Sequence, residues 1–376
     1  MKLFIIVNKD SFLLSHRREI VVEAVRRGDS VTVVAKDTGH SAEVRALGAE
    51  FIDLPIEPTG TNPLQEIKTL RFLCRLFRTH RPDVVHNVGL KTILWGGLAC
   101  RFTGVKAVVN AVSGLGTMFA SEHLSLVPRV IMRAIRYACH REGVKVIFQN
   151  DDDRRLFLDH RVITPEQCEF IKGSGVDLET YKYLPEPATE KRNVIFMARM
   201  VKEKGVLTLV EAANKLREKY VDSVEFWLCG GLSDNPQALS KEELEQMCDG
   251  HYIKWLGHRN DVMQLLGQAH IVAFPSYYRE GLPKSLIEAN AVGRPIVTTD
   301  SVGCRDAVEE GYNGYLIDVN DADALAARLD TLLSDAELRE RMGRNARCFA
   351  ERNFSIVDVV DRHLEIYDSL SLRQVV

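Results

Sequence analysis

The chain has 376 residues, of which 45% are hydrophobic and 27% charged. That length favours two domains of about 180 residues each, and the composition excludes an intrinsically disordered protein. The net charge is −3, but residues 1–180 carry 25 Lys and Arg against 21 Asp and Glu, while the remainder carries 24 against 31. We therefore expect the N-terminal half to contact an anionic surface or a phosphorylated substrate.

No segment has the composition of a membrane-spanning helix. The longest run without Asp, Glu, Lys or Arg is 107–121, which has 15 residues, whereas a span needs roughly 20 mostly apolar residues. The first apolar run predicts a buried strand rather than a signal peptide, because no small-residue cleavage site follows it. The eight cysteines form no C-x-x-C pair, which argues against a zinc site or a disulfide scaffold and favours a reducing cytosol.

Short β-branched runs alternate with helical patterns along the whole chain. In the first half, strands are predicted at residues 2–7, 30–35, 50–54, 83–86, 107–112 and 145–149, with helices that include 17–27 and 64–80. A second series has strands at 193–197, 225–229, 253–256, 271–275 and 295–298, and helices that include 205–220, 285–291 and 321–333. This alternation predicts two parallel sheets covered by helices on both faces.

The stretch 183–192 contains two prolines and several charges without periodicity, so it is the best candidate for a linker. We expect an N-terminal domain at 1–182 and a C-terminal domain at 183–355. A last helix, near 357–367 within the segment 356–376, is expected to pack back on the N-terminal domain. In doubly wound domains, ligands bind at the carboxyl ends of the strands.

The most informative segment for chemistry is 273–300. A buried strand is followed by a loop carrying Glu280 and by a helix that begins near Lys284, with Glu288 about one turn into it. Backbone N–H groups at such a helix start favour a diphosphate, and a carboxylate there accepts hydrogen bonds from the vicinal hydroxyls of a sugar. The alternative is a pair of surface glutamates without function.

A second segment places two cations after a predicted strand. Arg199 and Lys204 precede Gly205 and an amphipathic helix. Two cations at this position suit a diphosphate whose leaving-group charge grows as a glycosidic bond breaks. The alternative is two solvated basic residues in a loop.

Several N-terminal segments are predicted to be loops that face a cleft between the two domains. The loop after the first strand, at 8–20, carries His16 and Arg17, and three others span residues 86–91, 113–119 and 149–157. The last contains three aspartates, 151–153, whose D-x-D pattern could hold a metal; we favour a helix N-terminus with acidic first-turn residues.

Two helical patterns carry basic residues at spacings of three and four. Apolar residues such as Leu64 and Ile67, and Leu126 and Val130, are expected to pack beside them. These faces are either simply solvated or attach to an anionic membrane leaflet. The basic residues are Lys68, Arg71, Arg75 and Arg78 in the first, and Arg129, Arg133, Arg136 and His140 in the second.

Taken in order, these segments resemble the family 4 retaining glycosyltransferases. The resemblance rests on EGLPKSLIEA at 280–289 and on ARMVKEKG at 198–205, where Ala198 replaces the first Gly of a G-R-x-x-x-x-K-G element. It is strongest toward bacterial transferases that extend a sugar on undecaprenyl diphosphate, such as N-acetylgalactosaminyltransferases of N-glycan assembly and capsule or O-antigen enzymes. SHR at 15–17, PDVVH at 82–86 and SGLG at 113–116 are shared with that group. The implied fold is α/β, of the GT-B type, with two Rossmann-like doubly wound domains facing a cleft.

The resemblance also implies roles for individual residues. Glu288 would bind the nucleotide ribose, Glu280 the donor hexose, and Arg199 and Lys204 the donor phosphates. Pro283 stands where many members have Gly, so one backbone N–H contact is missing. The further donor-binding residues implied are Gly281, Leu282, Lys284, Ser285, Gly257, His258 and Gly230; the acceptor-binding ones are His16, Arg17, Lys91, Gly114 and Gly116; and membrane contact falls to Lys68, Arg71, Arg75 and Arg78.

The implied reaction moves a hexose or N-acetylhexosamine, with GalNAc or GlcNAc favoured, from a UDP-sugar to a polyprenyl-diphosphate-linked sugar with retention of configuration. A front-face displacement would need no enzymic nucleophile, no metal and no cofactor beyond the UDP-sugar substrate. The expected partners are the donor, the lipid-linked acceptor and the anionic inner-membrane surface, with no nucleic acid. We expect a cytoplasmic protein, peripheral on the cytoplasmic face of that membrane. A UDP-N-acetylglucosamine 2-epimerase, a soluble acceptor and a non-catalytic sugar- or lipid-binding protein are the alternatives.

Overall fold

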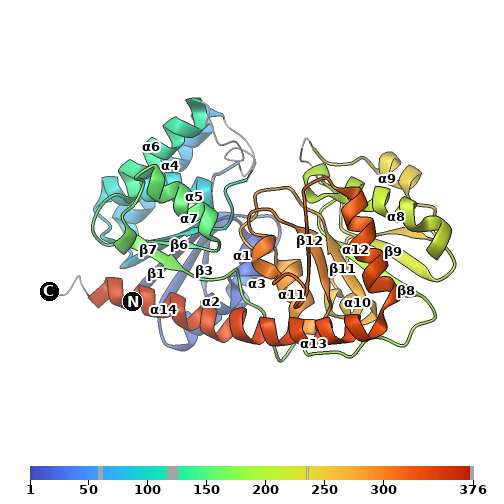
Figure 1. Ribbon diagram of the computed structural model, residues 1–376. Coiled ribbons are helices and arrows are strands. Elements are labelled where there is room, and N and C mark those ends of the chain that lie inside the picture. Colours follow the sequence, from blue (N-terminus) through green and yellow to red (C-terminus); the bar gives the residue numbers. More distant parts are fainter. Residues whose placement is uncertain (58–61, 117–125, 234, 236, 373–376) are drawn as a thin grey trace. The chain divides into compact units, whose positions relative to one another are not determined.

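The computed structural model describes residues 1–57, 62–116, 126–233, 235 and 237–372 (Figure 1). The chain divides into two compact units, Met1–Ser174 with Ile356–Val376, and Gly175–Ser355. The expected boundary at 182/183 therefore falls eight residues late, because residues 175–182 pack with the second unit. The structure also places the C-terminal helix in the first unit.

The first unit is built on a parallel sheet in the order β3-β2-β1-β4-β5-β6-β7. The order reverses between β1 and β4, as in other doubly wound sheets. Its interior strands are buried on both faces, which explains why their sequences are mostly apolar and do not alternate with exposed polar residues. The polar residues His86, Asn87 and Asn110 within them are buried as well. The strands are β1 (Lys2–Lys9), β2 (Ser30–Lys36), β3 (Glu50–Asp53), β4 (Val84–Val88), β5 (Ala107–Val112), β6 (Val144–Phe148) and β7 (Cys168–Phe170).

Helices cover both faces of this sheet. Phe4 and Ile6 of β1 contribute to the hydrophobic core on one face, and Leu3, Ile5 and Val7 to the core on the other. The helices are α1 (Asp10–His16), α2 (Arg18–Arg26), α3 (Ser41–Ala46), α4 (Pro63–His80), α5 (Leu90–Thr103), α6 (Leu126–Cys139), α7 (Asp151–Asp159) and α14 (Ile356–Leu372).

Two segments expected to be loops are regular structure. The stretch after β1 forms α1 directly and then α2, so the prediction of a loop at 8–20 was wrong. Residues 86–91 were also expected to be a loop, but His86 lies within β4 and α5 begins at Leu90. Only Gly89, with φ of 92°, separates that strand from that helix.

The C-terminal helix α14 is fixed to the first unit by packing and by polar contacts. Its apolar side, which includes Leu364, joins the same core as β1. Tyr367 Oη lies 2.7 Å from Nδ1 of the buried His86, and Arg27 Nη2 pairs with Asp368 at 2.9 Å. These contacts join segments at the two ends of the chain.

The second unit has a parallel sheet in the order β10-β9-β8-β11-β12-β13 around one hydrophobic core. The two parallel sheets confirm the predicted α/β class. The strands are β8 (Arg192–Met197), β9 (Val224–Cys229), β10 (Ile253–Gly257), β11 (Ile271–Phe274), β12 (Ile296–Thr299) and β13 (Gly314–Ile317). The helices are α8 (Val206–Tyr220), α9 (Lys241–Met247), α10 (Val262–Gln268), α11 (Lys284–Val292), α12 (Ala322–Ser334) and α13 (Ala336–Asn353).

Candidate active site

The polar residues singled out in the second half of the sequence gather at one edge of the six-stranded sheet. Arg199 follows β8, Gly230 follows β9, and the loop that carries Glu280 follows β11. Because these strands are parallel, their carboxyl ends and the loops that leave them lie at the same edge. This edge is where a doubly wound domain binds its ligand.

Lys204 and Glu280 form an ion pair at this edge. Lys204 ends a short 3-10 turn, Lys202–Lys204, and its Nζ contacts Oε1 of Glu280. The side chains are only 13% and 12% exposed, so water weakens their attraction less than at an open surface. Ser276 Oγ lies 3.3 Å from the same carboxylate oxygen, and Lys204 Nζ lies 5.1 Å from the ring centroid of Tyr278. The pair thus places a cation and a carboxylate side by side.

Arg199 lies close to the same aromatic ring but is exposed. Burial raises the pKa of the Tyr278 phenol and the Glu280 carboxylate adds to that rise, while the Arg199 charge opposes it. Arg199 and Lys204 therefore both flank Tyr278. Two cations at one strand end have the charge and the donors that suit a diphosphate.

Glu288 lies in the first turns of α11 and is only 6% exposed. Its Oε1 lies 3.4 Å from Lys284 Nζ and accepts a hydrogen bond from Tyr181 Oη at 2.9 Å. Burial raises the pKa of this carboxyl group, and the two donors oppose that rise. We did not single out Tyr181 from the sequence, because its contact with Glu288 spans 107 positions.

Two glycines allow the loops of the site to approach each other. Gly205 has φ of 81°, and a Cβ there would lie 1.9 Å from the carbonyl oxygen of Pro275. Gly303 has φ of 82°, and a Cβ there would lie 2.0 Å from the carbonyl oxygen of Gly281. Any side chain at either position would displace the loop that carries Lys204 or Glu280. Gly303 was missed, since an isolated glycine after a strand is a weak signal.

The other predicted donor residues occupy different environments. Leu282 is buried in the hydrophobic core of the second unit, so its side chain does not line an open site. Ser285 is partly exposed in the first turn of α11, and His258 is exposed. Gly230 N–H donates to the carbonyl of Gly257 at 2.8 Å, which joins the ends of β9 and β10. Residues 234 and 236 of the loop after β9 lie outside the described residues.

Predicted acceptor residues of the first unit are largely engaged in its own packing. Arg17 is 2% exposed, and its side chain points into the interior, where its charge acts on His86, His363 and Tyr367. His16 stacks on Phe12 with ring centroids 4.2 Å apart. A direct acceptor contact for Arg17 is thus unsupported by its position.

Lys91 is also engaged, because its Nζ pairs with Glu66 Oε1 at 2.6 Å. Gly114 and Gly116 follow β5 with positive φ, while residues 117–119 of that predicted loop lie outside the described residues. The aspartates 151–153 form the first turn of α7, with Asn150 as its N-cap. This is the helix N-terminus that we favoured from the sequence as the explanation of the D-x-D pattern. Among the described residues, no group of three His, Cys, Asp or Glu side chains is placed to hold a metal.

The basic residues of α4 and α6 are accompanied by exposed apolar side chains. On α4, Leu64 and Ile67 are 78% and 43% exposed. On α6, Leu126 and Val130 are 79% and 60% exposed. The basic face of α4 consists of Lys68, Arg71, Arg75 and Arg78, all exposed.

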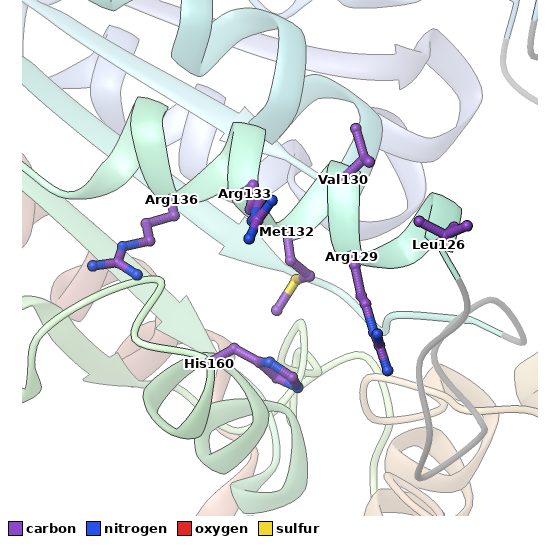
Figure 2. A pocket seen from close by; sticks show the side chains of 7 residues that line it. All are labelled: Leu126, Arg129, Val130, Met132, Arg133, Arg136 and His160. Carbon is purple, nitrogen blue, oxygen red and sulfur yellow. The ribbon is translucent and has the colours of Figure 1, made fainter.

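Beside α6 lies a hollow of about 380 Å³ (Figure 2). Most of the side chains that line it come from one helix face, while His160 follows the end of α7. The lining is therefore cationic and apolar without a carboxylate. Its residues are Leu126, Arg129, Val130, Met132, Arg133, Arg136 and His160.

Two family models match the chain, one in each unit. Residues 2–150 match "Glycosyl transferase 4-like" and residues 182–349 match "Glycosyl transferases group 1". The chain is 26% identical to the N,N'-diacetylbacillosaminyl-diphospho-undecaprenol alpha-1,3-N-acetylgalactosaminyltransferase of Campylobacter jejuni, over 94% of this chain and 95% of that protein. It is 22% identical to the UDP-Gal:alpha-D-GlcNAc-diphosphoundecaprenol alpha-1,3-galactosyltransferase of Escherichia coli, over 90% and 88% of the two chains.

Solved structures share the whole fold. The crystal structure of Anabaena HepE in complex with UDP matches with a TM-score of 0.79 and 19% identity, over 98% of this chain and 100% of that one. The two family models together cover most of both units, and the matches to these proteins extend over nearly their full length. The chain therefore belongs to the group 1, family 4 glycosyltransferases and has the GT-B architecture of two Rossmann-like domains.

Proposed function

We propose that this glycosyltransferase moves a hexose or N-acetylhexosamine, with GalNAc or GlcNAc favoured, from a UDP-sugar to a polyprenyl-diphosphate-linked sugar with retention of configuration. The observation that carries the proposal is the Lys204–Glu280 ion pair at the carboxyl edge of the second sheet. The buried Glu288 lies on α11, the helix that follows the Glu280 loop. The names of the Campylobacter and Escherichia relatives, which match nearly the full chain, support an undecaprenol-diphosphate acceptor.

In the proposed donor complex, each polar group has one task. Glu288 accepts hydrogen bonds from the ribose hydroxyls, and Glu280 orients the hexose. Arg199 and Lys204 bind the diphosphate, one as a bidentate fork and the other as a point charge. The start of α11 adds backbone N–H groups, although its N-cap, Pro283, contributes none.

The proposed chemistry is a front-face displacement. The bond between the anomeric carbon and the diphosphate oxygen breaks while a bond to the acceptor hydroxyl oxygen forms on the same face. The departing diphosphate oxygen takes the proton of that hydroxyl. Arg199 and Lys204 stabilise the negative charge that grows on the leaving group, and Glu280 holds the sugar in register, so the mechanism uses no metal.

The exposed faces of α4 and α6 are the proposed contact with the anionic cytoplasmic leaflet that carries the acceptor. Arginines and lysines attract anionic lipid headgroups, and neighbouring side chains such as Leu64, Leu126 and Val130 insert among them. Within the described residues, no helix has both the length and the apolar character needed to cross a bilayer.

The test is incubation of the purified protein with a panel of UDP-sugars and polyprenyl-diphosphate acceptors, with products identified by mass spectrometry and anomeric configuration by NMR. We expect one donor–acceptor pair to give an α-linked extended lipid. Transfer only to soluble sugars would overturn the lipid acceptor, and an inverted product would overturn retention. Formation of an epimeric UDP-sugar without acceptor would instead identify the 2-epimerase alternative, which the family matches already disfavour.

A further inference from the structure

The buried Glu288 is held by a phenol from a distant segment of the chain. Tyr181 lies in the stretch 175–182 that joins the second unit ahead of β8. Its Oη donates to Oε1 of Glu288 at 2.9 Å. Burial and the nearby carboxylate both raise the pKa of the Tyr181 phenol, so it remains protonated at neutral pH and serves as the donor.

The backbone that carries Tyr181 is itself fixed. Arg347 of α13 donates from Nη1 to the carbonyl oxygens of Tyr181, at 2.7 Å, and Ala291 of α11, at 3.0 Å. The N–H of Tyr181 donates to the carbonyl of Asp177 at 2.8 Å. One guanidinium therefore ties the Tyr181 segment to the helix that carries Glu288, which leaves the phenol little freedom to move.

Two donors approach the same oxygen of Glu288. Tyr181 Oη lies 2.9 Å and Lys284 Nζ 3.4 Å from Oε1. An ionised carboxylate offers about four acceptor positions, so it can hold these two donors and still accept hydrogen bonds from a ligand. Burial opposes ionisation of Glu288, whereas a hydrogen bond to the carboxylate favours it.

We propose that Tyr181 is a positioning residue that fixes the Glu288 carboxylate for hydrogen bonds to the ribose hydroxyls of a nucleoside diphosphate. This rests on the proposed function, in which Glu288 binds the donor ribose. Tyr181 does not touch the reacting atoms; it acts through Glu288, by orientation and by favouring the ionised form. Nothing in the sequence pattern of the 280–289 segment indicates this partner.

The test is calorimetric titration of the full chain with UDP and with 2′-deoxy-UDP between pH 5.5 and 8.5. For Tyr181→Phe we expect UDP affinity to fall on the order of tenfold at pH 6, as for loss of a hydrogen bond to a charged group, and less at pH 8.5. The acid limb of the binding profile moves to higher pH. The UDP preference over 2′-deoxy-UDP shrinks, because the ribose contact is the one disturbed.

Tyr183→Phe is the matched control. It removes a phenol oxygen from the same segment, but the Tyr183 ring packs against Gly293 rather than contacting Glu288. We expect its binding profile and sugar preference to equal those of the wild type. Thermal unfolding of both variants separates a positioning role from a loss of stability.

Glu288→Gln separates the two proposals. If this variant binds UDP and 2′-deoxy-UDP as the wild type does, the ribose role of Glu288 fails, and the inference fails with it. If Glu288→Gln weakens UDP binding while Tyr181→Phe keeps the wild-type profile at every pH, only the role of Tyr181 is overturned. If Tyr181→Phe lowers the affinity for UDP and for 2′-deoxy-UDP equally at every pH, the proposal that Tyr181 positions Glu288 is also contradicted.

Discussion

Lys204 and Glu280 form an ion pair across 76 positions of sequence, at the carboxyl edge of the second sheet. The lysine comes from the turn after β8 and the glutamate from the loop after β11. In the proposed donor complex, this pair sets the spacing between the cation that binds the phosphates and the carboxylate that orients the sugar.

Removing either partner should reduce turnover without unfolding the protein. We expect Lys204→Ala and Glu280→Ala each to lower kcat at least tenfold, because each loses stabilisation formed at the reacting centre. Since the two side chains act together, the double variant should lower kcat by less than the product of the two single decreases. Lys202→Ala is the control, because this lysine lies in the same turn but faces Glu243 at 3.9 Å. Wild-type rates in both single variants would refute the site.

Gly303 should be essential to the position of the Glu280 loop. In Gly303→Ala, the added methyl meets the carbonyl of Gly281 in addition to the strain of a positive φ. Gly311→Ala has the same kind of strain, with φ of 73°, but no atom within 4 Å of its Cβ. We expect Gly311→Ala to cost about 1–2 kcal/mol of stability with normal turnover.

Gly303→Ala should lose more stability than this control and at least tenfold in turnover. Steady-state kinetics and thermal unfolding measure both effects. Equal turnover and equal stability in Gly303→Ala and Gly311→Ala would show that the close approach to Gly281 does not position the Glu280 loop.

Stability should decline in acid because of a buried cluster beneath α14. Burial, with the Arg17 charge nearby, lowers the pKa of His363 to about 3, and burial with His363 and Arg17 holds the pKa of His86 well below its usual value. In the unfolded chain, histidine titrates near pH 6.5. The folded state therefore binds fewer protons, so stability is lost as pH falls below about 6.5.

For His363 the expected loss between pH 6.5 and pH 5 is about 2 kcal/mol. Urea unfolding at the two pH values measures it. His363→Gln should flatten the dependence by that amount, whereas His160→Gln, which changes an exposed histidine, should not. An unchanged slope in His363→Gln would contradict the assignment.

The basic face of α4 should control binding to anionic vesicles. Each basic residue near an anionic surface contributes on the order of 1 kcal/mol, which corresponds to about fivefold in affinity. We expect Arg71→Gln to weaken binding to such vesicles about fivefold, and combined changes at Lys68, Arg71 and Arg75 to weaken it on the order of 100-fold. Sedimentation with phosphatidylserine vesicles measures this.

Arg341→Gln provides the matched control, because it removes one charge from an exposed position of α13 in the other unit. Its vesicle binding should equal that of the wild type. Equal losses in Arg71→Gln and Arg341→Gln would attribute the effect to net charge alone. Vesicle binding that does not depend on lipid charge would contradict the proposal that the basic face of α4 binds anionic lipids.

Local pattern was sufficient for much of the fold. The β-branched runs of both units predicted most strands to within two residues, because strands buried on both faces of a parallel sheet are mostly apolar. Helix α13 escaped prediction because its many charged residues hide the apolar stripe that packs on α11. The short α1 was missed because no side-chain cap marks its start.

The sequence by itself determined that Glu280 and Glu288 flank the start of one helix, since that depends only on a spacing of eight within a strand, loop and helix. Tertiary structure alone decided that Lys204 meets Glu280, that Tyr181 holds Glu288, and that Arg17 is buried beneath α14 instead of facing an acceptor. The physical reason is the distance along the chain. Contacts across 76 or 107 positions form only after parallel strands align their carboxyl ends, and no local periodicity encodes that alignment.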